Sequence, residues 1–255
     1  VETFAEFAAV CAEQFGDRVK KWMVFNEPGS VASHLLIGGY GRRGLYPRHT
    51  LRCVHHMNLA SAEAGRRMRD ILPATAEIGT THIITLARPY SPTDERTRRR
   101  KAAIEALTSD MFIDPAGGLG YPFEKNRLLR LMEPAIADGD LEAATFHYDF
   151  LGIQYYGPVV LKKLPLVGAI PTMSVPNPEV KLRSDIGIPA TPAGLYWALH
   201  KYRDHPAADR LVVTEAGLGL QDRLIEGAVN DDVRIWYLRE HLRWVLRARQ
   251  DGIPV

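Results

Sequence analysis

Hydrophobic positions at the start of the chain follow first a helical and then a strand-like spacing. Apolar side chains recur every three or four residues, at Phe4, Phe7, Ala8, Cys11 and Phe15. This spacing predicts a helix that buries one face, and Gly16 stands where a C′ glycine would end it. The mostly apolar run that follows, residues 19–25, predicts a buried strand. The first segment is therefore expected to form a helix-then-strand unit.

The same order of helix and strand recurs three more times. Helical spacing covers residues 50–72, 93–112, 122–137, 191–203 and 230–252, and strand-like apolar runs cover residues 77–84, 150–155 and 211–214. Thr50, and Thr191 before Pro192, stand where capping hydroxyls would begin two of these helices. Helices that alternate with short apolar strands predict an α/β fold with a parallel sheet. Four strand signals do not decide between an open doubly wound sheet and a closed (β/α)8 barrel.

Residues 158–189 interrupt this alternation. They are rich in proline and glycine and show little periodicity, which predicts a loop. Loops of this length inside a compact domain are usually functional or disordered.

Composition and charge narrow the class of protein. The chain has 255 residues, 46% of them apolar and 24% charged, which is ordinary for a globular protein. Its formal charge of +2 gives no sign of a nucleic-acid or membrane-surface binder. The two cysteines cannot form a disulfide framework, and no run approaches the roughly 18 apolar residues of a membrane span. We therefore expect a cytoplasmic protein with no nucleic-acid or membrane partner.

Sequence patterns typical of cofactor, phosphate or metal sites are weak. Residues 39–44 match the dinucleotide pattern G-x-G-x-x-G, but a helical segment precedes them and Pro47 follows. The basic run at residues 96–101 is flanked by acidic residues at helical spacing, which predicts a solvated helix face. Cys53, His55 and His56 lack a second ligand pair, and adjacent helical residues point about 100° apart. No cofactor and no metal are expected.

Two glutamates follow predicted strands directly. Glu27 comes after the strand at 19–25, and Glu215 comes after the strand at 211–214. Acidic residues at the carboxyl ends of parallel strands face the active-site mouth in both α/β architectures. A single glutamate there is more often a solvated loop residue, but two in the same position favour a site.

Three segments of the chain resemble motifs of glycoside hydrolase family 1, the β-glucosidase family. Residues 22–28, WMVFNEP, are similar to its Thr-Phe-Asn-Glu-Pro signature, and residues 213–217, VTEAG, resemble its Ile-Thr-Glu-Asn-Gly motif. Residues 149–156, DFLGIQYY, are similar to its Asp-Phe-Leu-Gly-Ile-Asn-Tyr-Tyr segment. The resemblance implies a (β/α)8 TIM barrel, of which this chain carries about the fourth to seventh strands as one incomplete domain over residues 1–255.

The resemblance also assigns roles to five residues. Glu27 corresponds to the acid/base and Glu215 to the nucleophile, and Tyr156 would donate a hydrogen bond that orients Glu215. Asn26 would bind the sugar 2-hydroxyl, and Gln154, where the family usually has asparagine, would lie near the glycone pocket. A second departure is Ala216, which also replaces asparagine.

Paired carboxylates suit the hydrolysis of glycosidic bonds. One carboxylic acid protonates the leaving oxygen while the other carboxylate attacks the anomeric carbon. In a retaining enzyme the two stand roughly 5 Å apart. The resemblance therefore implies double displacement on terminal β-D-glucosides or related β-glycosides.

Alternatives remain at this point. Counterparts of the family's first three strands and its last strand are absent from the chain, so it is expected to be an internal segment completed by missing segments or by a second chain. Alone, it is not expected to fold as a stable monomer, because inward-pointing apolar residues would lack an opposing core; these include Val24, Ile83, Ile153 and Val213. A catalytically inactive family 1-like fragment or sugar-binding remnant is the competing interpretation. An aldolase is disfavoured because Lys20 and Lys21 lie at the wrong end of their strand.

Overall fold

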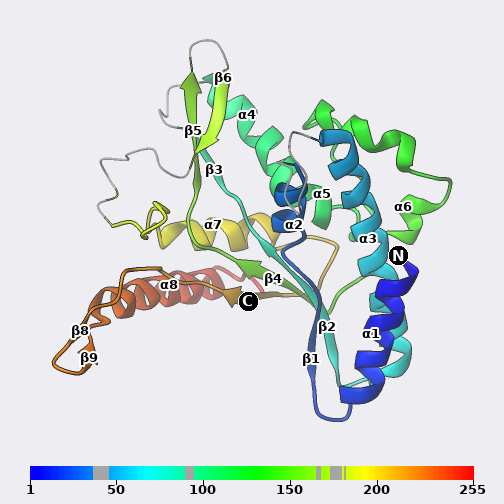
Figure 1. Ribbon diagram of the computed structural model, residues 1–255, viewed down its shortest axis with the longest axis horizontal. Coiled ribbons are helices and arrows are strands. Elements are labelled where there is room, and N and C mark those ends of the chain that lie inside the picture. The colour runs from blue at the N-terminus through cyan, green and yellow to red at the C-terminus, as the bar shows by residue number, and fades with distance from the viewer. Residues whose placement is uncertain (37–45, 90–94, 165–167, 173–179, 181) are drawn as a thin grey trace. The chain divides into compact units, whose positions relative to one another are not determined.

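The computed structural model describes residues 1–36, 46–89, 95–164, 168–172, 180 and 182–255 (Figure 1). The chain divides into two compact units. The first comprises Val1–Ile83, Ala106–Gly152 and Asp204–Val212, and the second comprises Ile84–Glu105, Ile153–Arg203 and Val213–Val255. The expectation of one domain over residues 1–255 stays a prediction.

The first unit contains two strands of a four-stranded sheet and the first residues of the other two. Its elements are α1 (Glu2–Phe15), β1 (Lys21–Asn26), α2 (Pro28–Leu36), α3 (Pro47–Ile71), β2 (Glu77–Ile83), the π-helical turn η1 (Ala106–Asp110), α5 (Met111–Ile113), the 3-10 helix η2 (Arg127–Ala135) and α6 (Asp140–Ala143). β4 (Phe150–Gln154) and β7 (Leu211–Glu215) begin in this unit and end in the second. The sheet order is β1-β2-β4-β7, with β1 parallel to β2 and a parallel bridge from Tyr148 to Ala208 shortly before β4 and β7. All four predicted strands are confirmed, with ends that differ by one or two residues.

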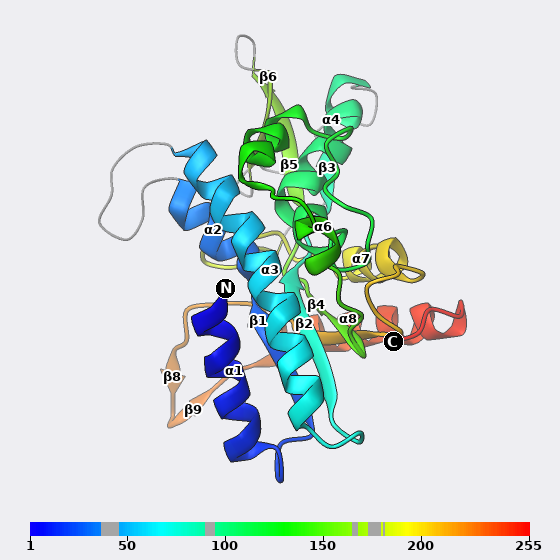
Figure 2. The same ribbon diagram turned by 90° about the vertical axis from the view of Figure 1, so that its right-hand side faces the viewer.

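Helix α1 exists as predicted, but its buried face differs from the predicted one. The buried residues are Ala5, Ala8 and Ala12, whereas Phe7 is 65% exposed. These alanines share a core with small residues of α3, and Figure 2 shows the two helices side by side. Alanine lets two helix backbones approach closely, so the alanine stripe faces the neighbouring helix with Phe4 packed beside it, whereas Phe7 and Phe15 are exposed.

Gly16 and Gly252 end their helices for different reasons. Gly252 has φ of 81°, the left-handed conformation that favours glycine after a helix, as its position predicts. Gly16 instead keeps a right-handed φ of −62°. A Cβ at Gly16 would lie 2.5 Å from the Ala12 carbonyl oxygen and 2.8 Å from Leu72 Cδ2, so glycine is required there by space and not by φ. Gly16 therefore ends the helix as predicted, but the left-handed conformation expected of a C′ glycine is wrong.

The two predicted threonine caps are also wrong. Helix α3 begins at Pro47, which suits a first helical turn, so Thr50 lies inside the helix and is buried. Helix α7 (Ala193–Tyr202) begins after Pro192. The Thr191 hydroxyl lies 3.0 Å from the Tyr155 hydroxyl and is used in that contact.

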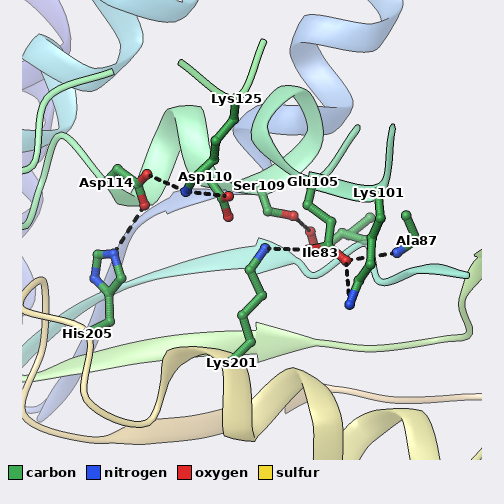
Figure 3. Close-up of polar contacts among 10 residues, drawn as sticks. All are labelled: Ile83, Ala87, Lys101, Glu105, Ser109, Asp110, Asp114, Lys125, Lys201 and His205. Atoms are coloured by element: carbon green, nitrogen blue, oxygen red, sulfur yellow. Dashed lines mark hydrogen bonds and ion pairs between the residues drawn. The ribbon is translucent and has the colours of Figure 1, made fainter. Parts of the chain in front are cut away.

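The predicted helix at 93–112 is interrupted, and the one at 122–137 is shorter and tighter. Residues 106–110 form a π-helical turn that buries Asp110, which pairs with Lys125 at 3.2 Å (Figure 3). In the second segment only Arg127–Ala135 is helical, as a 3-10 helix. Pro134 cannot donate the backbone hydrogen bond that an α-helix would need at this point.

The second unit carries the remaining elements. They are β3 (Ala87–Pro89), α4 (Glu95–Glu105), β5 (Val159–Leu164), β6 (Gly168–Thr172), α7, β8 (Leu224–Ile225), β9 (Ala228–Val229) and α8 (Asp232–Gln250). A sheet of order β3-β5-β6 joins a parallel β3–β5 pair to an antiparallel β5–β6 hairpin. The loop prediction for residues 158–189 is therefore wrong over β5 and β6, because backbone pairing with each other and with β3 supplies an order that periodicity does not reveal.

Two residues expected to point into an incomplete interior are covered within the chain. Val24 packs, with Trp22, against the core formed by α1 and α3, so it faces helices. Ile153 is fully buried. On β1 the side chain that alternates away from this core is Met23, which is 53% exposed.

Among the described residues, no helix has the length and apolar content needed to cross a bilayer. The glycine pattern at residues 39–44 lies outside the described residues. The predicted helix at the basic run 96–101 is confirmed, because these residues belong to α4.

Burial of His82 predicts that acid destabilises the protein. His82 is 5% exposed, and burial lowers the pKa of His82 from 6.5 to about 3. Below pH 6.5 the unfolded chain therefore binds a proton that the folded chain does not. The free energy of unfolding is therefore highest above pH 6.5, with respect to this histidine. It falls by roughly 1.4 kcal/mol per pH unit as the pH drops from 6.5 toward 3. We expect a lower urea midpoint for the intact protein at pH 5 than at pH 7.

The variant His82→Gln should flatten this decline, because glutamine does not titrate. His56→Gln, at an exposed histidine of α3, serves as the control and should follow the unmodified protein. An equal pH dependence for His82→Gln and the unmodified protein would rule out His82 as the cause.

Candidate active site

Glu27 lies in the turn between β1 and α2 with an unusual backbone conformation. Its φ is 49°, in the left-handed region that non-glycine residues seldom adopt. Its N–H donates to the Thr81 carbonyl at 3.1 Å, and its own carbonyl accepts from Ser30 N–H at 3.0 Å. These bonds tie the residue to β2 on one side and to the first turn of α2 on the other. The backbone at Glu27 is thus held by both elements that flank it.

The Glu27 carboxylate has a partner that sequence reasoning missed. Ser30 Oγ donates to Glu27 Oε2 at 2.7 Å. A serine three residues after the glutamate, in the first turn of a helix, was the available signal. Asn26 is the last residue of β1, pairs in register with Thr81 and is exposed. Asn26, Glu27 and Ser30 therefore form one polar group within the first unit.

Glu215 ends β7 and receives a donor at each carboxylate oxygen. Gln154 Nε2 donates to Oε1 at 2.6 Å, and Tyr156 Oη donates to Oε2 at 2.5 Å. Tyr155 N–H also donates to the Glu215 carbonyl at 3.1 Å, which holds the end of β7 against the end of β4. Two donors fix the orientation of the carboxylate, as a nucleophile requires. The structure thus brings together three of the five predicted site residues in the second unit.

Gln154, which stands where the family motif usually has asparagine, contacts Glu215 in the structure. Gln154 is fully buried and its amide reaches the nucleophile candidate directly. The longer side chain therefore orients Glu215. Ala216, the other departure, contributes no polar group to the carboxylate.

Tyr156 is held by α8, a contact that sequence reasoning also missed. Tyr237 Oη donates to the Tyr156 carbonyl at 3.4 Å. Tyr237 is fully buried, its ring centroid lies 3.9 Å from that of His241, and burial raises the pKa of Tyr237 to about 12. Its hydroxyl therefore stays protonated as a donor at neutral pH. An aromatic on the buried face of the last helix was the only sequence signal.

Removing the Tyr156 hydroxyl should weaken catalysis without unfolding the protein. A hydrogen bond to a charged group contributes about 1.5–3 kcal/mol, so Tyr156→Phe should lower kcat/KM roughly 10- to 100-fold. The matched control is Tyr155→Phe, which loses contacts to Thr191 and none to Glu215. Tyr155→Phe should lower the melting temperature and leave kcat/KM close to normal. Equal losses of kcat/KM in both variants would contradict the role of Tyr156.

The Cys53 region has no metal-site character in the structure. Within the described ranges, no group of three or more His, Cys, Asp or Glu residues could hold a metal ion. His55 is buried, with Nδ1 2.9 Å from Tyr121 Oη and Nε2 2.9 Å from Asp140 Oδ2. Its hydrogen-bonding capacity is used in joining α3 to α6 and to the segment after α5.

Glu27 and Glu215 belong to the first and second units, respectively. Each carboxylate has a hydrogen-bond donor from its own unit, and each directly follows or ends a strand of the four-stranded sheet. Each carboxylate thus lies where a strand ends and is oriented by a donor of its own unit.

The chain matches one family profile and several known proteins over nearly its whole length. The family profile described as glycosyl hydrolase family 1 matches residues 1–255. A 6-phospho-β-galactosidase of Clostridium acetobutylicum is 32% identical over 286 residues, covering 100% of this chain and 59% of that protein. A 1,4-β-D-glucan glucohydrolase of Thermotoga neapolitana is 30% identical over 257 residues, covering 99% of this chain and 59% of that protein.

Solved structures give the same result for the fold. A β-glucosidase from Thermotoga maritima in complex with deoxynojirimycin has a TM-score of 0.85 at 26% identity, covering 98% of this chain and 56% of that one. The AHE enzyme from Alicyclobacillus herbarius has a TM-score of 0.87, covering 99% of this chain and 56% of that one. The chain thus spans a little over half the length of these relatives. The predicted fold class, an α/β chain that forms part of a (β/α)8 barrel, is confirmed.

Proposed function

Because this chain belongs to glycosyl hydrolase family 1, we propose that the intact protein is a retaining glycoside hydrolase that cleaves terminal β-D-glucosides or related β-glycosides. The observation that carries the proposal is Glu215, which ends β7 with a donor on each carboxylate oxygen. A carboxylate that merely faces solvent has no need of two oriented donors. A nucleophile does, because it must stay ionised and aimed at one atom.

In the first step, a Glu215 oxygen forms a bond to the anomeric carbon as the bond to the leaving oxygen breaks. Glu27 gives its proton to that oxygen. In the second step, the Glu27 carboxylate takes a proton from water, whose oxygen attacks the anomeric carbon and releases Glu215. Two inversions give net retention, and each residue ends in its starting protonation state.

Neighbouring residues support these two roles. Tyr156 and Gln154 hold Glu215, and Ser30 holds one oxygen of Glu27 so that the other is available to the leaving group. Asn26, beside the acid, would bind the sugar 2-hydroxyl, a contact that strengthens in the transition state. We expect the strands needed to close the barrel to come from further residues of the protein or from a second chain.

The test is hydrolysis by the intact protein. It should release 4-nitrophenol from 4-nitrophenyl β-D-glucoside, and proton NMR should show the β-anomer of glucose as the first product. The 6-phosphorylated glucoside and the corresponding galactosides are assayed alongside, since two of the relatives are named for a phosphorylated galactoside and for a glucan. An α-anomer as first product would contradict the retaining mechanism. Binding of glucosides without turnover of any of these substrates would favour the sugar-binding remnant.

A further inference from the structure

A pocket lies within the second unit, among α4, α7 and α8. Its volume is about 750 Å³, inside the range of small-molecule sites. We call it the tryptophan pocket, and the residues that characterise it are Trp197, His200, Trp236, Glu240, Trp244 and Lys101. None of these is used in the proposed reaction.

Three indoles line the tryptophan pocket from two helices. Trp236, Glu240 and Trp244 are four residues apart on α8, so they share one face of that helix. Trp197 comes from α7, which packs beside α8 (Figure 1). Trp197 is 57% exposed and Trp236 is 42% exposed. Large indole faces are therefore open to a ligand.

Neighbouring rings hold two of these indoles in place. The Tyr196 ring makes edge contacts with Trp197 and Trp244, at centroid distances of 5.1 and 5.9 Å. Its hydroxyl donates to Asp251 at 3.0 Å, and His200 contacts Trp197 at 5.8 Å. Binding surfaces that are rigid before the ligand arrives lose less entropy on binding.

Charged groups of the two signs are balanced around the pocket. Glu105 accepts from the Ala87 N–H at 3.1 Å and pairs with Lys201 at 3.4 Å and Lys101 at 3.8 Å (Figure 3). Glu240 pairs with Arg243 at 2.5 Å. Lysine ammonium groups and carboxylates offer donors and acceptors together, with no excess of one charge that would select an ion.

The tryptophan pocket and Glu215 use different residues of one short segment. Gln154 and Tyr156 donate to Glu215, whereas Tyr155 between them lines the pocket and contacts Thr191. Neighbouring residues of an extended chain point to opposite sides. The pocket therefore lies on the opposite side of this segment from the carboxylate.

We propose that the tryptophan pocket is a second carbohydrate-binding site, which takes a neutral pyranose or a short β-glucan chain. A pyranose ring has an apolar C–H face that stacks on an indole and a rim of hydroxyls that both donate and accept hydrogen bonds. The exposed indoles of Trp197 and Trp236 can stack on the C–H face. The charged groups of Lys101, Glu105 and Glu240 can donate hydrogen bonds to the hydroxyls or accept them. This site binds sugar without cleaving it, and its existence does not depend on the proposed hydrolysis.

The test uses the intact protein carrying Glu215→Gln, so that the probe, cellotetraose, is not consumed. Calorimetric titration should show binding at two sites. Adding Trp197→Ala and Trp236→Ala should weaken one of them roughly tenfold or more and leave the other unchanged. The matched control is Phe7→Ala, at an exposed aromatic of the first unit, which should keep both. In the otherwise unmodified protein, the tryptophan variants should hydrolyse 4-nitrophenyl β-D-glucoside within about twofold of the normal rate.

Three results would overturn this assignment. The first is unchanged cellotetraose binding in the double tryptophan variant. The second is preferential binding of glucose 6-phosphate at this pocket, which would make it an anion site. The third is a crystal structure of the intact protein in which other residues fill the pocket. Failure of hydrolysis with retention of tryptophan-dependent binding would reject the proposed function and leave this site standing.

Discussion

Replacing Glu215 with glutamine is expected to lower kcat for glucoside hydrolysis by about 10⁴-fold or more. Glutamine keeps the shape of the side chain and can still meet Tyr156 and Gln154, but its neutral amide cannot attack the anomeric carbon. The measurement is release of 4-nitrophenol by the intact protein. A 2-deoxy-2-fluoroglucoside, which slows the second step, should label the unmodified protein by one sugar on Glu215, detected by mass spectrometry of peptides.

The control for this variant is Glu226→Gln, at an exposed glutamate of the same unit. It should keep normal activity and normal labelling. A label found on another residue, or activity of Glu215→Gln above a hundredth of normal, would remove Glu215 from the nucleophile role.

Replacing Glu27 with glutamine should affect substrates unequally. Cellobiose needs its leaving oxygen protonated, so its cleavage should fall roughly 10²- to 10⁴-fold. A dinitrophenyl glucoside has a leaving group that departs as an anion, so its first step should proceed near the normal rate. The second step still needs a base, and we expect a rapid burst of dinitrophenol followed by slow turnover, measured by stopped flow.

Azide should accelerate the slow phase of Glu27→Gln, because an anionic nucleophile needs no base, and the product should be the β-glucosyl azide. The control is Glu13→Gln, at an exposed glutamate of α1, which should behave normally with both substrates. Equal losses on both substrates, with no burst, would show that Glu27 is not the acid.

The sequence is informative where a signal is local. Glu27 and Glu215 could be placed at strand ends because short apolar runs immediately precede them, and β4 and β7 do end beside the predicted Gln154 and Glu215. The contact from Tyr156 to Glu215, which the family resemblance implies, is present as well, because Tyr156 follows β4 by two residues and Glu215 ends β7. The strand-end positions predicted from local runs are therefore correct, although other predictions about the fold are wrong.

Features that depend on distant partners were beyond the reach of sequence patterns. Helix α1 has two apolar stripes, and only the packing surface of α3 selects the alanines over Phe7. β5 and β6 are ordered by pairing with each other and with β3, not by their own periodicity. Tyr237, which supports Tyr156, lies about 80 residues further along the chain and has no motif of its own.

The left-handed backbone at Glu27 bears on how this position would change over evolutionary time. A non-glycine residue in this conformation costs about 1–3 kcal/mol, which glycine would largely avoid. Mutation without selection for chemistry would therefore favour glycine or asparagine at position 27, since each would make the protein more stable. If Glu27 is the acid of the proposed reaction, the variant Glu27→Gly should be at once more resistant to heat and catalytically inert.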